Sequence, residues 1–168
     1  MTAYTTIDTP VGELLLVGEP SATATGGTAL VSVSMTGQRN AAVVQDGWTH
    51  RPEAFAEIAR QIRAYFAGGR STFELEYATR GTDFQRQVWA ALETVPYGTT
   101  TTYGRLAERA GIPRSAVRAI GAAIGANPLL LVRPCHRVIG ADGSLTGYAG
   151  GLGRKQQLLA HEGATRAA

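Results

Sequence analysis

Two short helical segments separated by a break at residues 111–113 constrain the fold of this chain more than any other feature of its sequence. Thr102 is placed to cap a first helix over residues 103–110, and the Gly-Ile-Pro break leads into a second helix over residues 114–125. Helix, glycine-containing turn and helix is the helix-turn-helix pattern. Because many folds that bind no DNA also join two helices through glycine, the pattern alone predicts an architecture and not a function.

The second predicted helix is built mainly from small residues. Only Arg114 and Arg118 extend outward from it, and residues 119–125 are alanines and glycines apart from two isoleucines. Small side chains allow a backbone to approach another surface closely. The helix lacks the long side chains, such as asparagine and glutamine, that read base edges in the major groove. This composition favours a minor-groove contact that is indifferent to sequence.

Charge is distributed unevenly between the two halves of the chain. Residues 1–80 carry a net charge of −2, residues 81–168 carry +5, and Lys155 is the only lysine. A basic half suggests a polyanionic partner, although a solvated basic surface would give the same balance. No segment is long and apolar enough to span a bilayer, and the first residues lack the pattern of a secretion signal. We therefore expect a cytoplasmic protein with no membrane partner.

The first half predicts strands followed by a helix. Residues 5–7 and 13–17 flank a proline- and glycine-containing turn and predict a hairpin, and residues 29–35 predict another strand. A proline then opens a helix over residues 53–66, whose apolar residues share one face and which ends at two glycines. Nothing in this half has the pattern of a catalytic site, so we interpret it as structural.

The composition changes where a mainly helical half begins. Asp83 is predicted to cap a helix over residues 84–94, and residues 155–162 are predicted to form the last helix. We therefore divide the chain into an N-terminal α/β structural domain at residues 1–78 and a second domain at residues 79–168.

The one cysteine of the chain lies in the motif Arg-Pro-Cys-His-Arg at residues 133–137. A single cysteine excludes an intrachain disulfide and a multi-thiolate metal site. Thiolates are nucleophiles, and the cationic neighbours of Cys135 are expected to lower its pKa. Adjacent side chains in extended chain point apart, so His136 would take the thiol proton through a water molecule, with Glu162 on its other ring nitrogen. The residues themselves thus predict a Cys–His–Glu nucleophile.

At these residues the chain resembles the O6-methylguanine-DNA methyltransferases, the alkylguanine DNA alkyltransferases. Pro-Cys-His-Arg-Val at residues 134–138 is similar to the active-site signature of that family. The resemblance spans about residues 81–163 in order and spacing, through Phe-Gln-Arg-Gln-Val-Trp, Pro-Tyr-Gly, Thr-Tyr, Val-Arg-Ala, Ala-Asn-Pro, Gly-Tyr-Ala-Gly-Gly-Leu and Leu-Leu. It implies a mixed α/β fold, in which a small domain with an antiparallel, ribonuclease H-like sheet precedes a mainly helical domain with a winged helix-turn-helix.

The resemblance also implies a reaction. The alkyl group of O6-alkylguanine in double-stranded DNA would pass irreversibly, and once per protein molecule, to Cys135. His136 would activate the thiol through water, and Glu162 would hold the imidazole. Asn127 would be the hinge between the helix-turn-helix and the active site.

Further residues are implied in binding DNA and the damaged base. Arg118 would enter the duplex and fill the gap left by a flipped base, with Arg114 and Ala119 contacting DNA beside it. The residues implied at the base itself are Tyr103, which would also help to rotate the nucleotide, the backbone of Val138, the loop at Tyr148 and Ala149, and Lys155, which would aid loss of the guanine.

The implied protein is a monomer that needs no cofactor, with O4-alkylthymine as a second candidate substrate and cooperative assembly on DNA left open. Some members of the family bind structural zinc in the first domain. That domain contains no cysteine here, so no metal is predicted. Ala149 stands where many relatives have serine, so a hydrogen bond to the guanine oxygen would have to come from the backbone there.

Four other interpretations use the same residues. A cysteine hydrolase would need the same three groups, but it would leave the helix-turn-helix unexplained. A non-catalytic lesion sensor of the alkyltransferase-like type would carry another residue at position 135. A winged-helix regulator would need base-reading side chains. A zinc site at Cys135, His136 and His161 would need adjacent residues as ligands, at a spacing that matches no common site.

Overall fold

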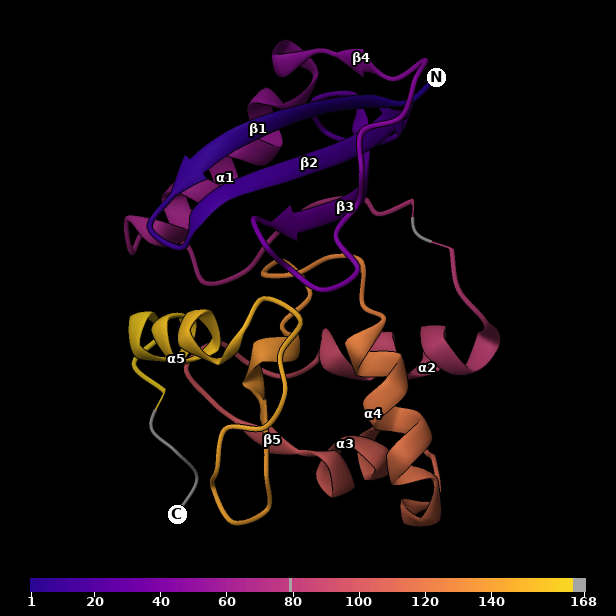
Figure 1. Cartoon of the computed structure of the whole chain (residues 1–168), viewed down its shortest axis with the longest axis vertical. Coiled ribbons are helices and arrows are strands. Elements are labelled where there is room, and N and C mark those ends of the chain that lie inside the picture. The colour runs from indigo at the N-terminus through magenta and orange to yellow at the C-terminus, as the bar shows by residue number, and fades with distance from the viewer. Residues whose placement is uncertain (79, 165–168) are drawn as a thin grey trace. The chain divides into compact units, whose positions relative to one another are not determined.

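The computed structural model describes residues 1–78 and 80–164, and these form two compact units that divide near residue 80 (Figure 1). The first unit is built around a mainly antiparallel sheet, and the second is mainly helical. Among the described residues, no helix is long and apolar enough to cross a membrane. The mixed α/β fold class expected from the sequence is confirmed.

The sheet of the first unit is built on the predicted hairpin. β1 (Ala3–Thr9) pairs antiparallel with β2 (Gly12–Pro20), and β2 pairs antiparallel with β3 (Thr28–Met35). The two-residue strand β4 (Thr49–His50), which the sequence did not predict, adds a parallel edge beside β1, so the order is β3-β2-β1-β4. Alternate residues of β1 are buried, as expected for a strand with one face on a core.

A helix lies against this sheet (Figure 1). The 3-10 turn η1 (Pro52–Phe55) leads into α1 (Ala56–Phe66). Pro52 stands at the first position of the turn, where a backbone N–H would have no partner within the helix, so proline costs no hydrogen bond. Ile58 and Ile62 are buried one turn apart and pack the apolar face of the helix into the core.

The second unit begins with α2 (Asp83–Leu92), and its cap differs from the prediction. Thr82, not Asp83, is the N-cap. Its hydroxyl accepts the Gln85 N–H, and the Gln85 side chain accepts the Thr82 N–H, which together make a complete capping box. Asp83 instead stands in the first turn, where its negative charge interacts favourably with the helix dipole.

The predicted pair of helices is present in the second unit. α3 (Tyr103–Ala110) is followed by the 3-10 turn η2 (Arg114–Ala116) and by α4 (Val117–Gly125). Gly111 ends α3 with a φ of 69°, a left-handed conformation that glycine adopts without strain. α2 packs against both α3 and α4, and these two helices also contact each other. The small residues of α4 thus form part of a helix-turn-helix arrangement.

The cysteine lies between α4 and the last helix. The 3-10 turn η3 (Cys135–Arg137) runs directly into β6 (Val138–Ile139), which pairs in parallel with β5 (Thr101–Thr102). α5 (Leu152–His161) packs against η3 and begins earlier than the sequence predicted. The turn that carries the cysteine is therefore held between a short strand pair and a helix.

Candidate active site

Cys135 is the first residue of η3 and is buried, with 4% of its surface exposed. Its N–H donates to the carbonyl of Arg133 at 2.8 Å, and its own carbonyl accepts the N–H of Val138. The segment is a tight turn and not the extended chain that the sequence suggested. The backbone of the cysteine is therefore fixed on both sides.

The thiol of Cys135 is less acidic than the sequence suggested. Burial raises its pKa from 9.0 to about 11, although the Asn127 amide and the charges of Lys155 and Arg133 act to lower it. The expectation of a lowered pKa is therefore wrong for the free protein, because the removal of the thiolate from water outweighs its cationic neighbours. A general base is needed to ionise this thiol near neutral pH.

Labelling of Cys135 by iodoacetamide should show the raised pKa. Because only the thiolate reacts, a pKa of about 11 in place of 9.0 leaves roughly 100-fold less thiolate at neutral pH. The labelling rate of the folded protein should rise about tenfold per pH unit from about pH 7 to pH 10, whereas the urea-unfolded chain should level off near pH 9. Because the folded state favours the neutral thiol, this group contributes fully to the free energy of unfolding below pH 9. The contribution is lost as the pH rises through about 11. A plateau near pH 9 in the folded protein would contradict the raised value.

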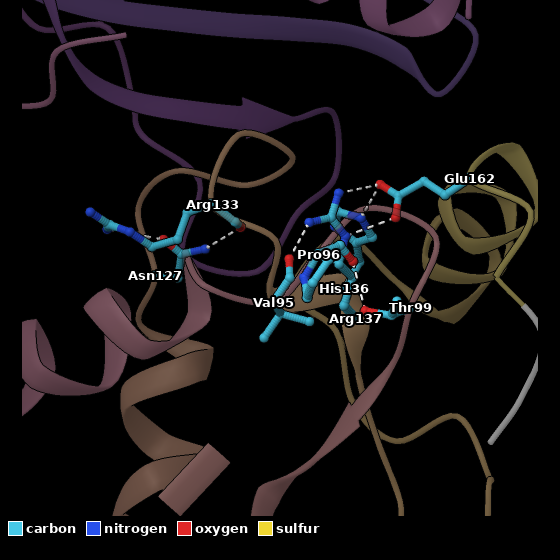
Figure 2. A network of polar contacts seen from close by, with 8 residues as sticks. All are labelled: Val95, Pro96, Thr99, Asn127, Arg133, His136, Arg137 and Glu162. Carbon is cyan, nitrogen blue, oxygen red and sulfur yellow. Dashed lines mark hydrogen bonds and ion pairs between the residues drawn. The ribbon is translucent and has the colours of Figure 1, made fainter. Parts of the chain in front are cut away.

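His136 and Arg137 share one buried carboxylate, that of Glu162 at the end of α5 (Figure 2). His136 Nε2 lies 2.8 Å from Glu162 Oε2. Arg137 donates through Nε to Oε1 at 2.8 Å and through Nη2 to Oε2 at 2.9 Å, which makes a bidentate pair. Arg137 Nη1 donates to the carbonyl of Val95 at 2.7 Å. The structure thus brings His136 and Glu162 together and adds Arg137, which was expected only as a cation near Cys135.

Burial lowers the pKa of His136, and the contact with Glu162 offsets this shift only in part. The ring is therefore neutral at neutral pH, and an Nε2–H that donates to Glu162 leaves Nδ1 as the hydrogen-bond acceptor. Nδ1 is buried and has no hydrogen-bond partner among the described residues. Its lone pair is available to accept a proton.

Asn127 joins the end of α4 to the segment that carries the cysteine (Figure 2). Its buried Oδ1 accepts the N–H of Leu129 at 3.0 Å and Nη1 of Arg133 at 3.3 Å. Its Nδ2 donates to the carbonyls of Leu129 and Arg133 at 3.3 and 3.2 Å. The side chain predicted to be a hinge therefore clamps the turn between α4 and η3.

Lys155 of α5 is fully buried and ties β6 to the glycine-rich loop that follows it. Its Nζ donates to the carbonyls of Val138, of Thr146 at 2.9 Å and of Gly147 at 3.5 Å. Burial lowers the pKa of Lys155 to about 8, while the charge of Cys135 acts in the opposite direction. Lys155 remains mostly protonated at neutral pH and adds positive charge near the thiol.

Tyr103, at the start of α3, reaches the same loop. Its hydroxyl lies 2.8 Å from Oγ1 of Thr146. A Cβ added at Gly121 of α4 would come within 3.9 Å of its ring. Tyr103 therefore lies between the helix-turn-helix and the glycine-rich loop, in which Tyr148 is buried and Ala149 is half-buried.

Three of the residues predicted to contact DNA lie on one exposed stretch of η2 and α4. Arg114, Arg118 and Ala119 are all exposed. Arg114 is paired with Glu108 at 2.6 Å. Within residues 1–78 and 80–164, Arg118 makes no such ion pair or hydrogen bond, so its guanidinium is available to a partner.

Two residues of this region were not predicted from the sequence as functional. Thr146 is one of many threonines in the chain, and no local pattern distinguishes it. Arg133 was expected only as a cation near Cys135, and its burial, with 4% of its surface exposed, was not predicted. In the described part of the chain, no group of three or more His, Cys, Asp or Glu side chains is placed to hold a metal ion.

Two family models match the chain, one in each unit. The model described as 6-O-methylguanine DNA methyltransferase, ribonuclease-like domain, matches residues 2–79, and that of the DNA binding domain matches residues 83–164. A methylated-DNA–protein-cysteine methyltransferase of Mycolicibacterium paratuberculosis is 49% identical over 162 residues, which cover 96% of this chain and 93% of that protein. The chain belongs to the methylated-DNA–protein-cysteine methyltransferase family. The resemblance seen in the sequence motifs is confirmed.

Members of this methyltransferase family from distant organisms are also similar to the chain. A methyltransferase of the same name from Methanosarcina acetivorans is 42% identical, with 95% of this chain and 97% of that protein covered. A crystal structure of Mycobacterium tuberculosis OGT in complex with DNA is 46% identical and superimposes with a TM-score of 0.85, over 95% of this chain and 92% of that one. The similarity extends over both units of the chain.

Proposed function

We propose that this protein repairs DNA by transferring the alkyl group of O6-alkylguanine in double-stranded DNA to Cys135. The observation that carries the proposal is a lone, buried cysteine followed by a histidine bound to Glu162, in a chain that matches both domains of the methyltransferase family. O4-alkylthymine has the same type of alkyl–oxygen bond and is a second candidate substrate.

The transfer is a single nucleophilic displacement at the alkyl carbon. The sulfur of Cys135 bonds to that carbon while the bond from carbon to O6 breaks, and its electron pair stays with the guanine. The thiol proton passes through a water molecule to Nδ1 of His136, and Glu162 stabilises the imidazolium that forms. The guanine, which is the leaving group, takes up one proton and is restored to the normal base within the DNA. Lys155, as a cation near the sulfur, favours both the thiolate and the departing anion.

The product is a thioether, which is a poor leaving group and offers no route back to the thiol. The chain has no second cysteine that could accept the group from Cys135. Each molecule therefore acts once, and the reaction consumes protein in proportion to lesions, with no cofactor.

The reacting oxygen lies inside a base pair, so the nucleotide must leave the stack at a cost of roughly a few kcal/mol. Arg118 would stack in the space that the base leaves, since a planar guanidinium interacts well with aromatic faces. Tyr103 would contact the rotated nucleotide, and the backbone of Val138 with the loop at Tyr148 and Ala149 would line its pocket. In this proposal the helix-turn-helix is of the winged type and binds the minor groove.

The two units then have different tasks. Residues 79–168 would bind DNA and carry the reaction, while residues 1–78 would be a structural domain. The protein would act as a monomer in the cytoplasm, and Arg114 and Ala119 would contact the DNA backbone beside Arg118.

Intact-mass spectrometry after incubation with O6-methylguanine duplex DNA tests the proposal. We expect a gain of one methyl group on Cys135 and an end to the reaction at one equivalent of DNA, because the thioether cannot be recycled. Cys135→Ser should abolish the transfer and still bind duplex DNA, because the helix-turn-helix is unchanged. Turnover beyond one equivalent, or a methyl group on another residue, would exclude this mechanism.

Binding to undamaged duplex DNA should be sensitive to salt and nearly independent of sequence. Each phosphate contact contributes a slope of about −0.9 to the logarithm of the binding constant against the logarithm of salt concentration. Arg114→Ala should therefore make the slope less steep by about 0.9 for every DNA sequence tested. Fluorescence anisotropy over a range of salt concentrations measures this, and a flat salt response in the unmodified protein would argue against the proposed surface.

A further inference from the structure

Arg133 is a buried cation to which the reaction described above assigns no role. Its guanidinium carbon lies 4.9 Å from the centroid of the Trp89 ring, and its Nε lies 3.6 Å from Oε2 of Glu93. Trp89 belongs to α2 and Glu93 caps the C-terminal end of that helix, whereas Arg133 lies two residues before Cys135. Burial of an arginine costs free energy unless the charge is paired. The side chain therefore connects the end of α2 to the segment that carries the cysteine.

The guanidinium sets the orientation of the Asn127 amide (Figure 2). A guanidinium can only donate hydrogen bonds, so its contact at 3.3 Å requires the oxygen of Asn127 to face Arg133. The N–H of Leu129 favours the same orientation. The amide nitrogen of Asn127 then donates to the carbonyls of Leu129 and Arg133, and the amide acts to lower the pKa of Cys135.

Arg133 also acts on Cys135 through its backbone and its charge. Its carbonyl accepts the N–H of Cys135 at 2.8 Å and an N–H of Asn127 at 3.2 Å. Its charge lowers the pKa of Cys135, against the larger effect of burial. One residue thus fixes the start of η3, orients the Asn127 amide and adds a positive charge.

We propose that Arg133 is a positioning residue for alkyl transfer, whose buried guanidinium directs the Asn127 amide toward Cys135 and favours the thiolate. The inference rests on the proposed function and extends it to a residue outside the Cys–His–Glu set.

The other charged groups around Cys135 allow this effect to be isolated. Lys155 of α5 supplies a second cation, held by backbone carbonyls. The neutral His136 and the charged Arg137 are both bound to Glu162. Glu93, the residue that follows α2, is the anion that faces Arg133 itself, and its side chain is 39% exposed.

Removal of the guanidinium and removal of its anion should therefore have different results. Arg133→Met removes the charge and keeps an apolar side chain of similar length over Trp89, whereas Arg133→Lys keeps the charge. Glu93→Gln breaks the same ion pair and leaves Arg133 in place, so the positive charge acts more strongly on Cys135. If the ion pair only stabilised the fold, the Met and Gln variants would behave alike.

Two measurements separate these possibilities: iodoacetamide labelling of Cys135 between about pH 7 and pH 10, and single-turnover methyl transfer from O6-methylguanine DNA. Loss of the Arg133 charge together with the orientation of Asn127 should raise the pKa of Cys135, so Arg133→Met should be labelled and methylated more slowly at each pH, by up to roughly tenfold for a shift of about one unit. Arg133→Lys should recover most of both rates. Glu93→Gln should be no slower than the unmodified protein in either measurement.

Labelling of Arg133→Met at or above the unmodified rate would overturn the inference, because a merely loosened site exposes the thiol and speeds its reaction. Slowing of Glu93→Gln to the level of Arg133→Met would also overturn it. If circular dichroism shows that Arg133→Met does not fold, Arg133→Lys and Glu93→Gln still test the inference. Both should keep most of the unmodified labelling and transfer rates, and a large loss in either would overturn it. Failure of the unmodified protein to accept a methyl group would instead contradict the proposed function, and the labelling measurement would still test Arg133.

Discussion

Glu162→Gln is expected to lower the free energy of unfolding of the second unit by about 3–5 kcal/mol, the usual cost of removing one partner from a buried ion pair. The side chain of Glu162 is fully buried, and its two oxygens accept hydrogen bonds from both Arg137 and His136. A glutamine has one acceptor oxygen and an NH₂ group that can only donate. The change therefore leaves the Arg137 charge buried without its counterion. Urea denaturation followed by circular dichroism measures the loss.

Glu108→Gln is the matched control for this effect. Glu108 also pairs with an arginine, Arg114, at a distance of 2.6 Å, but its side chain is 62% exposed. Exposed pairs contribute only about 0–1 kcal/mol, so this variant should unfold close to the unmodified midpoint. If the two variants lost equal stability, burial of the Glu162 network would not be the cause.

The same Glu162→Gln variant should also transfer methyl groups roughly 10- to 100-fold more slowly under conditions where it is folded, as is common when the partner of a working histidine is lost. His136 loses the carboxylate that orients its ring and that raises its pKa against the effect of burial. The base is then both less well placed and weaker. An unchanged transfer rate in the folded variant would show that Glu162 serves stability alone.

Arg118→Ala should slow repair of duplex DNA by roughly 30-fold, which corresponds to the loss of about 2 kcal/mol of desolvated cation–π stacking. Transfer from a free O6-alkylguanine base, such as O6-benzylguanine, should change by less than about twofold, because a free base needs no rotation out of a stack. Rapid-quench measurements on both substrates give the ratio.

Arg105→Ala is a suitable control for the loss of one positive charge, since Arg105 is exposed on α3 and was not predicted to enter the duplex. It should weaken DNA binding, but at saturating DNA its transfer rates from duplex DNA and from the free base should both stay close to those of the unmodified protein. An equal loss by Arg118→Ala on duplex and free base would mean that Arg118 shapes the pocket or the fold.

The parts of the fold that depend on local sequence were predictable. The hairpin follows from alternation around a turn, and the helix-turn-helix follows from Thr102 and Gly111, which act through their own backbone neighbours. The two-residue strands β4, β5 and β6 were not predicted, because each exists only through pairing with a distant segment. The capping residue of α2 was misplaced because threonine and aspartate adjoin and both can cap.

The contact between His136 and Glu162 was predictable from the sequence, whereas the electrostatics around Cys135 were not. Cys135 and His136 stand in a recognisable motif, Glu162 was expected from the predicted last helix, and the structure brings the histidine and the carboxylate together. The direction of the Cys135 pKa shift was wrong, because nearby letters in a sequence show charge but not burial. The same limitation applies to Arg133, which was expected as a cation near Cys135 but whose burial against Trp89 and pairing with Glu93 could not be read from the sequence.

Glu162 is the last residue of the site in the sequence, so it is also the last to be translated. A chain interrupted during translation after α4 and η3 would already contain the DNA-binding helices, Cys135 and His136, but not this carboxylate. Such a fragment would lack the anchor for Arg137 and the partner of the base. If the reaction consumes the protein, as proposed, a fragment that occupied a lesion without repairing it would shield the damage from full-length molecules. The late position of Glu162 makes reactivity a property of molecules in which α5 has been made and packed.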